Sequence, residues 1–91
     1  MIVTEKMASY GALIVAMKKP EFSQCVTKTR IGRPDIDTYG MTGYIPVDIE
    51  FEVYDIKVFA DLWHSVNRDE KYTNEINEIQ SRLGFRECYA K

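Results

Sequence analysis

The sequence predicts a small α+β fold, and three patterns support this prediction. Residues Val47 to Val53 alternate between apolar and acidic types, which is the period of a strand buried on one face. Residues Ile56 to Val66 carry apolar side chains at the spacing of an amphipathic helix, and a second such stripe ends at Leu83. We therefore expect a small antiparallel sheet with two C-terminal helices packed on one face.

The strand at 47–54 and the helix after it form the best-defined unit. The strand places two sets of side chains on opposite faces: Val47, Ile49, Phe51 and Val53 against Asp48, Glu50 and Glu52. Asp55 should cap the helix, because its carboxylate can accept a hydrogen bond from a free first-turn amide. The apolar stripe of the helix should cover the strand, and it consists of Ile56, Phe59, Leu62, Trp63 and Val66.

The N-terminal segment allows two interpretations, helix or strand. In the first, Thr4 caps a helix that ends near Lys18, with one face formed by Val3, Met7, Tyr10, Ile14 and Met17. Gly11 disfavours this helix by about 1 kcal/mol relative to alanine. In the second, residues 10–17 form a buried strand that turns into the next strand.

One more strand and a final helix complete the expected core. Residues Phe22 to Arg30 alternate and are rich in β-branched types, but the alternation is only half apolar, so an edge strand or a second-layer strand is expected rather than a central one. The last helix should run from about Asp69 or Thr73 to Leu83, with Gly84 in the left-handed position that often ends a helix. Residues 85–90 then form a short terminal strand. The apolar stripe of the last helix consists of Tyr72, Ile76, Ile79 and Leu83.

Length and composition predict one compact domain over residues 1–91. The chain is 45% hydrophobic and 29% charged, which is typical of an ordered globular protein. Its longest apolar run, at 12–17, is much shorter than the roughly 20 residues of a membrane span. The start lacks the basic region of a signal peptide, so we expect a cytoplasmic protein. Residues 1–46 carry six Lys and Arg against four Asp and Glu, and residues 47–91 carry six against ten.

The sequence contains no recognisable catalytic or metal-binding constellation. His64 is the only histidine, and Cys25 and Cys88 lie far apart rather than in a CxxC pair. We expect both cysteines to be free thiols, because small secreted scaffolds usually carry more cysteines. The glycines match neither GxGxxG nor GxxxxGK[ST], which would indicate phosphate binding. These observations predict no enzyme activity, no cofactor and no metal.

A glycine-rich loop is the first candidate contact site. It sets Tyr39, Met41 and Tyr44 among two glycines, and Tyr and Met are enriched in the cores of interfaces. The other interpretation is that one tyrosine covers the core and the glycines are turn residues. The first gives a partner-binding site of Tyr39, Met41, Tyr44 and Arg33. It belongs to a small protein-binding module that occupies a partner's surface, such as an inhibitor or adaptor encoded by a phage or mobile element.

A basic and aromatic cluster supports an alternative function. Cations beside stacking aromatics are what a nucleotide or a single-stranded nucleic acid requires. The residues of this alternative site are Lys28, Arg30, Arg33, Tyr39 and Tyr44. The carboxylates at 48, 50 and 52 are better interpreted as the solvated face of a half-buried strand. The identity of the partner and the oligomeric state stay open.

Overall fold

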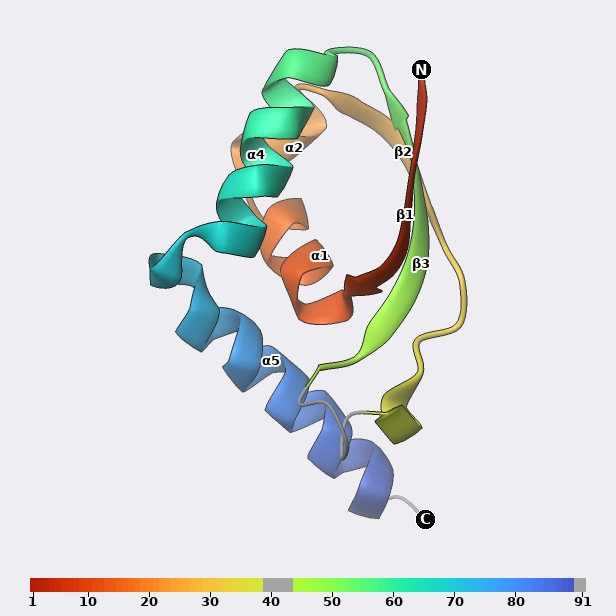
Figure 1. The fold of residues 1–91 in the computed structure, drawn as a ribbon, viewed down its shortest axis with the longest axis vertical. Helices are drawn as coiled ribbons and strands as arrows, with labels where there is room; N and C mark the ends of the chain where they lie inside the picture. The colour runs from red at the N-terminus through yellow and green to blue at the C-terminus, as the bar shows by residue number, and fades with distance from the viewer. Residues whose placement is uncertain (39–43, 90–91) are drawn as a thin grey trace.

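The computed structural model describes residues 1–38 and 44–89, with backbone only for 84–89. In these residues it has a three-stranded antiparallel sheet in the order β1-β3-β2 (Figure 1). The strands are β1 (Ile2–Ser9), β2 (Val26–Ile31) and β3 (Pro46–Val53). The helices are α1 (Tyr10–Met17), α2 (Pro20–Ser23), the 3-10 helix η1 (Ile36–Thr38), α4 (Ile56–Arg68) and α5 (Glu70–Tyr89).

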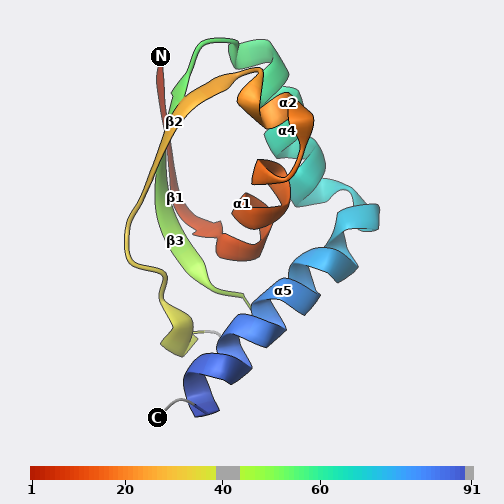
Figure 2. The ribbon, with the colours of Figure 1, turned by 180° about the vertical axis from the view of Figure 1, so that it is seen from behind.

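The fold has one covered and one uncovered sheet face. Figures 1 and 2 show α1, α2 and α4 on one side of the sheet, and among the described residues no helix on the other side. α5 packs chiefly against α1, with further contacts to α4 and η1. The α+β class is therefore confirmed, with both C-terminal helices on the helical side. Of these two helices, α4 lies over the sheet and α5 lies outside α1.

The alternation in β3 determines which face is covered. Its apolar residues are buried, whereas Asp48 and Glu52 are exposed and Glu50 is half-buried. Phe51 is fully buried, and its ring lies 4.8 Å from that of Phe59 between centroids. The rings of Phe22 and Trp63 also lie edge-on to it. The central strand thus buries its apolar side against α2 and α4, as its sequence predicts.

The helix α4 begins as expected. Asp55 is its N-cap, and the carboxylate accepts a hydrogen bond of 3.2 Å from the amide of Val58. Most of the predicted stripe faces the core, with Phe59 and Val66 buried. Ile56 is 44% exposed, because it lies in the first turn, beyond the end of β3.

The N-terminal segment is strand and helix in succession, so each interpretation is right for only part of it. Residues 2–9 form β1, and residues 10–17 form α1. The cap is Ser9 rather than Thr4, and the Ser9 hydroxyl accepts a 3.2 Å hydrogen bond from the amide of Ala12. α1 has no polar face, because it lies between the sheet and α5. A helix that is apolar on every face lacks the amphipathic period by which a surface helix is recognised.

The strand β1 is irregular near its end. Its pairing with β3 shifts between Glu5 and Ala8, which is a β-bulge. Within the bulge Met7 has a φ of 56°, in the left-handed region that costs an L-residue free energy. The amide of Met7 donates a 3.0 Å hydrogen bond to the carboxylate of Asp48. The β1 edge of the sheet is therefore bent, and one of its backbone amides is already bonded to a side chain.

The strand expected at 22–30 starts later than its alternation suggests. Pro20 opens the short helix α2, because its fixed φ suits a first helical position. Phe22 therefore lies in α2, and β2 begins at Val26. The expected edge position is confirmed, since β2 pairs only with β3 in the described sheet.

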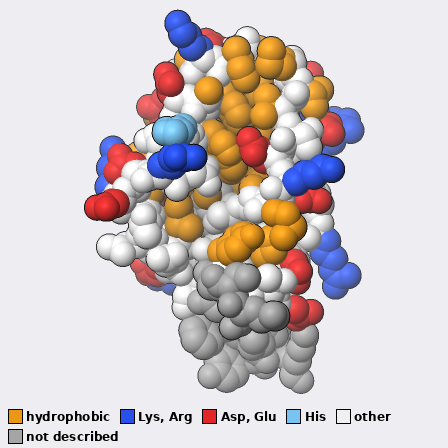
Figure 3. All heavy atoms as spheres, viewed as in Figure 1, with side chains coloured by type: hydrophobic (Ala, Val, Ile, Leu, Met, Phe, Trp, Pro, Cys, Tyr) orange, Lys and Arg blue, Asp and Glu red, His pale blue; other side chains and the backbone are white. Residues whose placement is uncertain are grey.

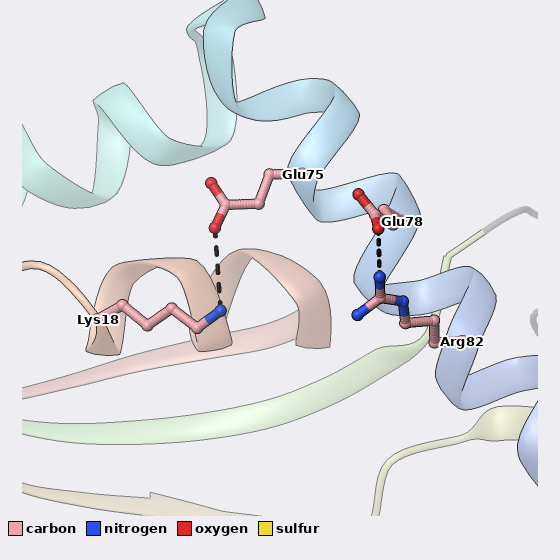
Figure 4. A network of polar contacts seen from close by, with 4 residues as sticks. All are labelled: Lys18, Glu75, Glu78 and Arg82. Carbon is pink, nitrogen blue, oxygen red and sulfur yellow. Dashed lines mark hydrogen bonds and ion pairs between the residues drawn. The ribbon is translucent and has the colours of Figure 1, made fainter.

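The last helix is longer than predicted. α5 continues through Gly84 to Tyr89. The predicted left-handed cap at Gly84 is therefore wrong, and the predicted terminal strand is wrong for residues 85–89. A glycine inside a helix lowers helix stability by about 1 kcal/mol relative to alanine. The neighbouring helical turns can offset this loss, and no proline follows Gly84 to end the helix. On α5, Glu78 and Arg82 form an ion pair at the i,i+4 spacing, and both side chains are exposed (Figure 4).

Gln80 of α5 joins three elements at one buried point. Its side chain is 1% exposed. The Gln80 Oε1 atom accepts hydrogen bonds from the hydroxyl of Ser9 at 2.9 Å and from the amide of Ile45 at 3.0 Å. The amide of Tyr10 donates in turn to the carbonyl of Ile45, at 2.9 Å. α5 is thereby tied to the start of α1 and to the segment that enters β3.

Replacing Gln80 by methionine should destabilise the fold by about 1–3 kcal/mol, because the buried amide of Ile45 loses its acceptor while the side-chain volume is nearly kept. Urea unfolding measures this loss. Asn77→Met makes a similar exchange at an exposed position of the same helix and should change stability by less than about 0.5 kcal/mol. Equal midpoints for the two variants would contradict this role of Gln80.

Gly11→Ala should destabilise, although helix propensity alone favours alanine by about 1 kcal/mol. A Cβ at Gly11 would lie 2.8 Å from Gln80 Cγ and 2.9 Å from the backbone oxygen of Ile76, so α1 and α5 would have to separate. Gly32→Ala is the matched control, since its Cβ would lie 3.6 Å from the nearest atom, the Asp48 oxygen. Thermal unfolding of both variants decides; a more stable Gly11→Ala protein would show that the helices do not approach this closely.

Candidate functional site

The structure tests only part of the predicted aromatic loop. Tyr39 and Met41 lie outside the described residues, so their role stays a prediction. Tyr44 is half-buried just before β3. Arg33 is exposed in the segment after β2.

The basic residues of the alternative site do not gather at one place. Lys28 and Arg30 lie on the uncovered sheet face, paired in register with Glu52 and Glu50 of β3. These four side chains and Ile2 line a shallow hollow of about 180 Å³. A polyanion approaching these two cations would therefore also meet carboxylates.

Arg33 lies in different surroundings. It lines a separate hollow of about 130 Å³ that also contains Asp35 and Asp48. The local charge there is again mixed. Closeness in sequence suggested one basic cluster, but the antiparallel register places a carboxylate opposite Lys28 and Arg30, and Arg33 shares its hollow with two aspartates.

The thiol of Cys25 is poorly placed for nucleophilic chemistry. Cys25 is a free thiol that is fully buried, and its Sγ donates to the carbonyl of Phe22 at 3.5 Å. Burial, and to a lesser extent the carboxylate of Asp55, raises the pKa of this thiol above its ordinary value. His64 is exposed on α4. No group of three or more His, Cys, Asp or Glu side chains in the described residues could hold a metal ion.

An apolar groove lies between α1 and β2 among the described residues. Its volume is about 440 Å³, and it is lined by Tyr10, Leu13, Ile14 and Met17 of α1, by Lys18 just after α1, and by Thr29 and Ile31 of β2. We call this the α1–β2 groove. Its strand wall belongs to β2, an edge strand of the sheet and the strand nearest the viewer in Figure 2. The helix α1 supplies apolar side chains here because its sequence is apolar on every face.

Two side chains of the groove are strongly exposed. Met17 is 51% and Ile31 47% exposed, although both are large and apolar. Leu13 is buried at the base of the same groove. The groove was not predicted, because it needs residues 10–17 as a helix and β2 as the neighbouring edge strand. Its only local signal was the continuous apolar character of 12–17.

A second apolar area lies at the opposite end of the sheet. Met1, Tyr54 and Ile56 are 72%, 60% and 44% exposed. They line a hollow of about 310 Å³ together with polar groups such as Thr27 and Glu52. Figure 3 shows hydrophobic side chains gathered around this end, between the start of β1 and α4. This area is smaller and more polar in its lining than the α1–β2 groove.

Comparisons with known proteins identify no relative. No protein-family model, no curated protein and no solved structure matches the chain significantly. Within the part of the chain that the structure describes, no helix has the length and apolar character needed to cross a membrane. The candidate surface must therefore be judged from its own geometry.

Cys25 should react slowly with a thiol reagent in the folded protein, because the thiolate is the reactive form and both burial and the raised pKa disfavour it. The measurement is the labelling rate of Cys25 in a Cys88→Ser variant at neutral pH. The same variant unfolded in guanidinium chloride provides the reference rate of an open thiol. Labelling of the folded protein at the reference rate would show that the thiol is accessible.

Proposed function

We propose that this chain is a small cytoplasmic protein-binding module that acts by occupying part of a partner's surface, as an inhibitor or an adaptor does. The observation that carries the proposal is the α1–β2 groove, an open apolar trough beside an unpaired strand edge. Grooves of this kind bind a helix or an extended chain from another protein. The proposal keeps the function expected from the sequence but moves its centre from the loop at 39–44 to this groove.

The energetics of the groove support a protein partner. Met17 and Ile31 expose apolar surface at its two walls, and covering such surface contributes roughly 25 cal/mol per Å². Interfaces concentrate their binding energy in a few well-packed central contacts. A partner side chain between these two residues would also contact the buried base at Leu13.

Nucleic-acid or nucleotide binding remains the alternative proposal, through Lys28, Arg30, Arg33, Tyr39 and Tyr44. Its support is the exposure of all three cations. The carboxylates beside each cation weaken it, because phosphate binding depends on uncompensated positive charge. Binding to a polyanion would fall steeply with salt, whereas binding in the apolar groove would not.

The test is a matched pair of double variants. Met17→Gln/Ile31→Thr makes the groove polar with little change of shape. Met7→Gln/Ile2→Thr makes the same two exchanges at exposed positions outside the groove. Tagged wild-type and variant proteins capture partners from native lysate treated with nuclease, and quantitative mass spectrometry compares the captured proteins.

We expect a protein that wild type and the control retain and that the groove variant loses about tenfold or more, since tenfold corresponds to about 1.4 kcal/mol. Circular dichroism must show that both variants are folded. Equal capture by the two variants would contradict the groove as the binding site. Loss of all capture after nuclease treatment would favour the nucleic-acid alternative.

A further inference from the structure

The outer side of β2 offers free backbone hydrogen-bonding groups. The amide of Gly32 donates to the carbonyl of Asp48 at 2.8 Å, which fixes the phase of the antiparallel ladder. Because bonded and non-bonded pairs alternate in such a ladder, Thr29 and Ile31 fall at the non-bonded positions opposite β3. Their amides and carbonyls therefore point away from the sheet. In the described residues, no hydrogen bond joins them to a helix or loop.

The same two residues line the α1–β2 groove. The side chains of Thr29 and Ile31 form its strand wall, while their backbone groups form its open rim. A strand added to this edge would place the residues opposite them on the same face of the sheet. Those residues would enter the groove and pack against α1. Free backbone groups and an apolar pocket are thus available to one extended segment.

The other exposed edge of the sheet is less suitable. β1 carries the bulge at Met7, and bulges interrupt the regular pairing that an added strand requires. The Met7 amide is already bonded to the carboxylate of Asp48. Only the β2 edge combines a regular stretch, at 28–31, with the groove.

The charges of β2 indicate which segment would fit. Lys28 and Arg30 lie on the uncovered face, and β2 contains no acidic residue. Residues of an added strand directly opposite them would have Cβ atoms about 4.5–5.5 Å away, close enough to interact. The carboxylates of β3 would lie two strands away, roughly 10 Å, where salt screens them. Acidic residues are therefore favoured at these positions of the segment.

A second copy of this chain fits the edge poorly. Two β2 strands paired antiparallel about Thr29 would bring Lys28 of each copy opposite Arg30 of the other, and pairing about Arg30 would set the two Arg30 side chains opposite each other. Like charges directly opposite destabilise a pair of strands. The β2 sequence therefore disfavours pairing with itself and leaves the edge available to a different chain.

We propose, on the basis of the proposed protein-binding function, that the β2 edge takes up an extended segment of the partner protein in which apolar and acidic residues alternate. The apolar residues lie opposite Thr29 and Ile31 and fill the α1–β2 groove. The acidic residues lie opposite Lys28 and Arg30 on the uncovered face. Main-chain hydrogen bonds supply affinity, and the groove and the two cations supply specificity.

The probe is a capped synthetic peptide of alternating valine and glutamate, added to isotope-labelled protein and followed by NMR. At saturation, hydrogen exchange of the Thr29 and Ile31 amides should slow by about tenfold or more, because they become bonded. The amides of Lys28 and Arg30, which already face β3, should change less. A valine–lysine peptide and a peptide with the valines and glutamates in separate blocks are the controls, and both should bind at least about tenfold more weakly.

Two variants of β2 sharpen the test. Thr29→Pro removes the amide that faces outward and leaves the hydrogen bonds between β2 and β3 in place. Edge strands tolerate proline at such a position. It should weaken peptide binding about tenfold or more, whereas Thr29→Val, which keeps the amide, should not. Lys28→Gln/Arg30→Gln should abolish the preference for glutamate over lysine in the peptide. Because that variant leaves every backbone group in place, it tests the charges even if the proline variant fails to fold.

The outcomes separate the two proposals. Equal binding of the three peptides, or protection of amides other than those of Thr29 and Ile31, overturns strand addition. If a partner protein depends on Met17 and Ile31 but binds folded Thr29→Pro as well as wild type, strand addition is wrong and the protein-binding function stands. If capture does not depend on the groove at all, the proposed function itself fails.

Discussion

The arrangement of this fold depends on the hydrogen bonds that the Gln80 side chain accepts. One donor, Ser9, also caps α1, and the other, the amide of Ile45, belongs to the residue that precedes β3. Ile45 is fully buried, so its amide has no water to replace Gln80. The position of α1 over the sheet is therefore set from outside, by α5. The ion pair of Lys18 with Glu75, at 3.9 Å and exposed, lies along the same contact and adds little (Figure 4).

The parts of the fold that sequence patterns predict are those held by local physics. The strand at 47–53 and its helix follow from alternation, a cap and a stripe, each visible within a few residues. The segment at 10–17 is different, because its helix is apolar on every face, and this follows from its contacts with the sheet, α4 and α5, which lie far away in sequence. Gly11 seemed to oppose a helix, yet its missing Cβ is what admits Gln80 and Ile76. The sequence around Gly84 resembles a helix end, but α5 continues past it.

The candidate site was harder to predict for a related reason. Lys28, Arg30 and Arg33 are neighbours in sequence, but their surroundings depend on the register with β3, which brings carboxylates beside them. The α1–β2 groove joins two segments whose contact no local pattern encodes. The open sheet face, by contrast, follows directly from the alternating acidic residues of β3. Residues 39–43 of the aromatic loop lie outside the described residues, so the role of this loop in partner binding stays a prediction.

The position of β3 in the centre of the sheet has a consequence for folding of the chain. β1 and β2 do not pair with each other. Both pair with β3, in which Phe51 is the partner of Val3 in β1 and of Thr29 in β2. During synthesis the first two strands and the apolar α1 are therefore made before their common partner exists. Contacts between residues far apart in sequence slow folding, and exposed apolar segments favour aggregation meanwhile. The core between the sheet and α4 can therefore begin to form only after β3 and the first turns of α4 are made, and the contacts of α1 with α5 form later still.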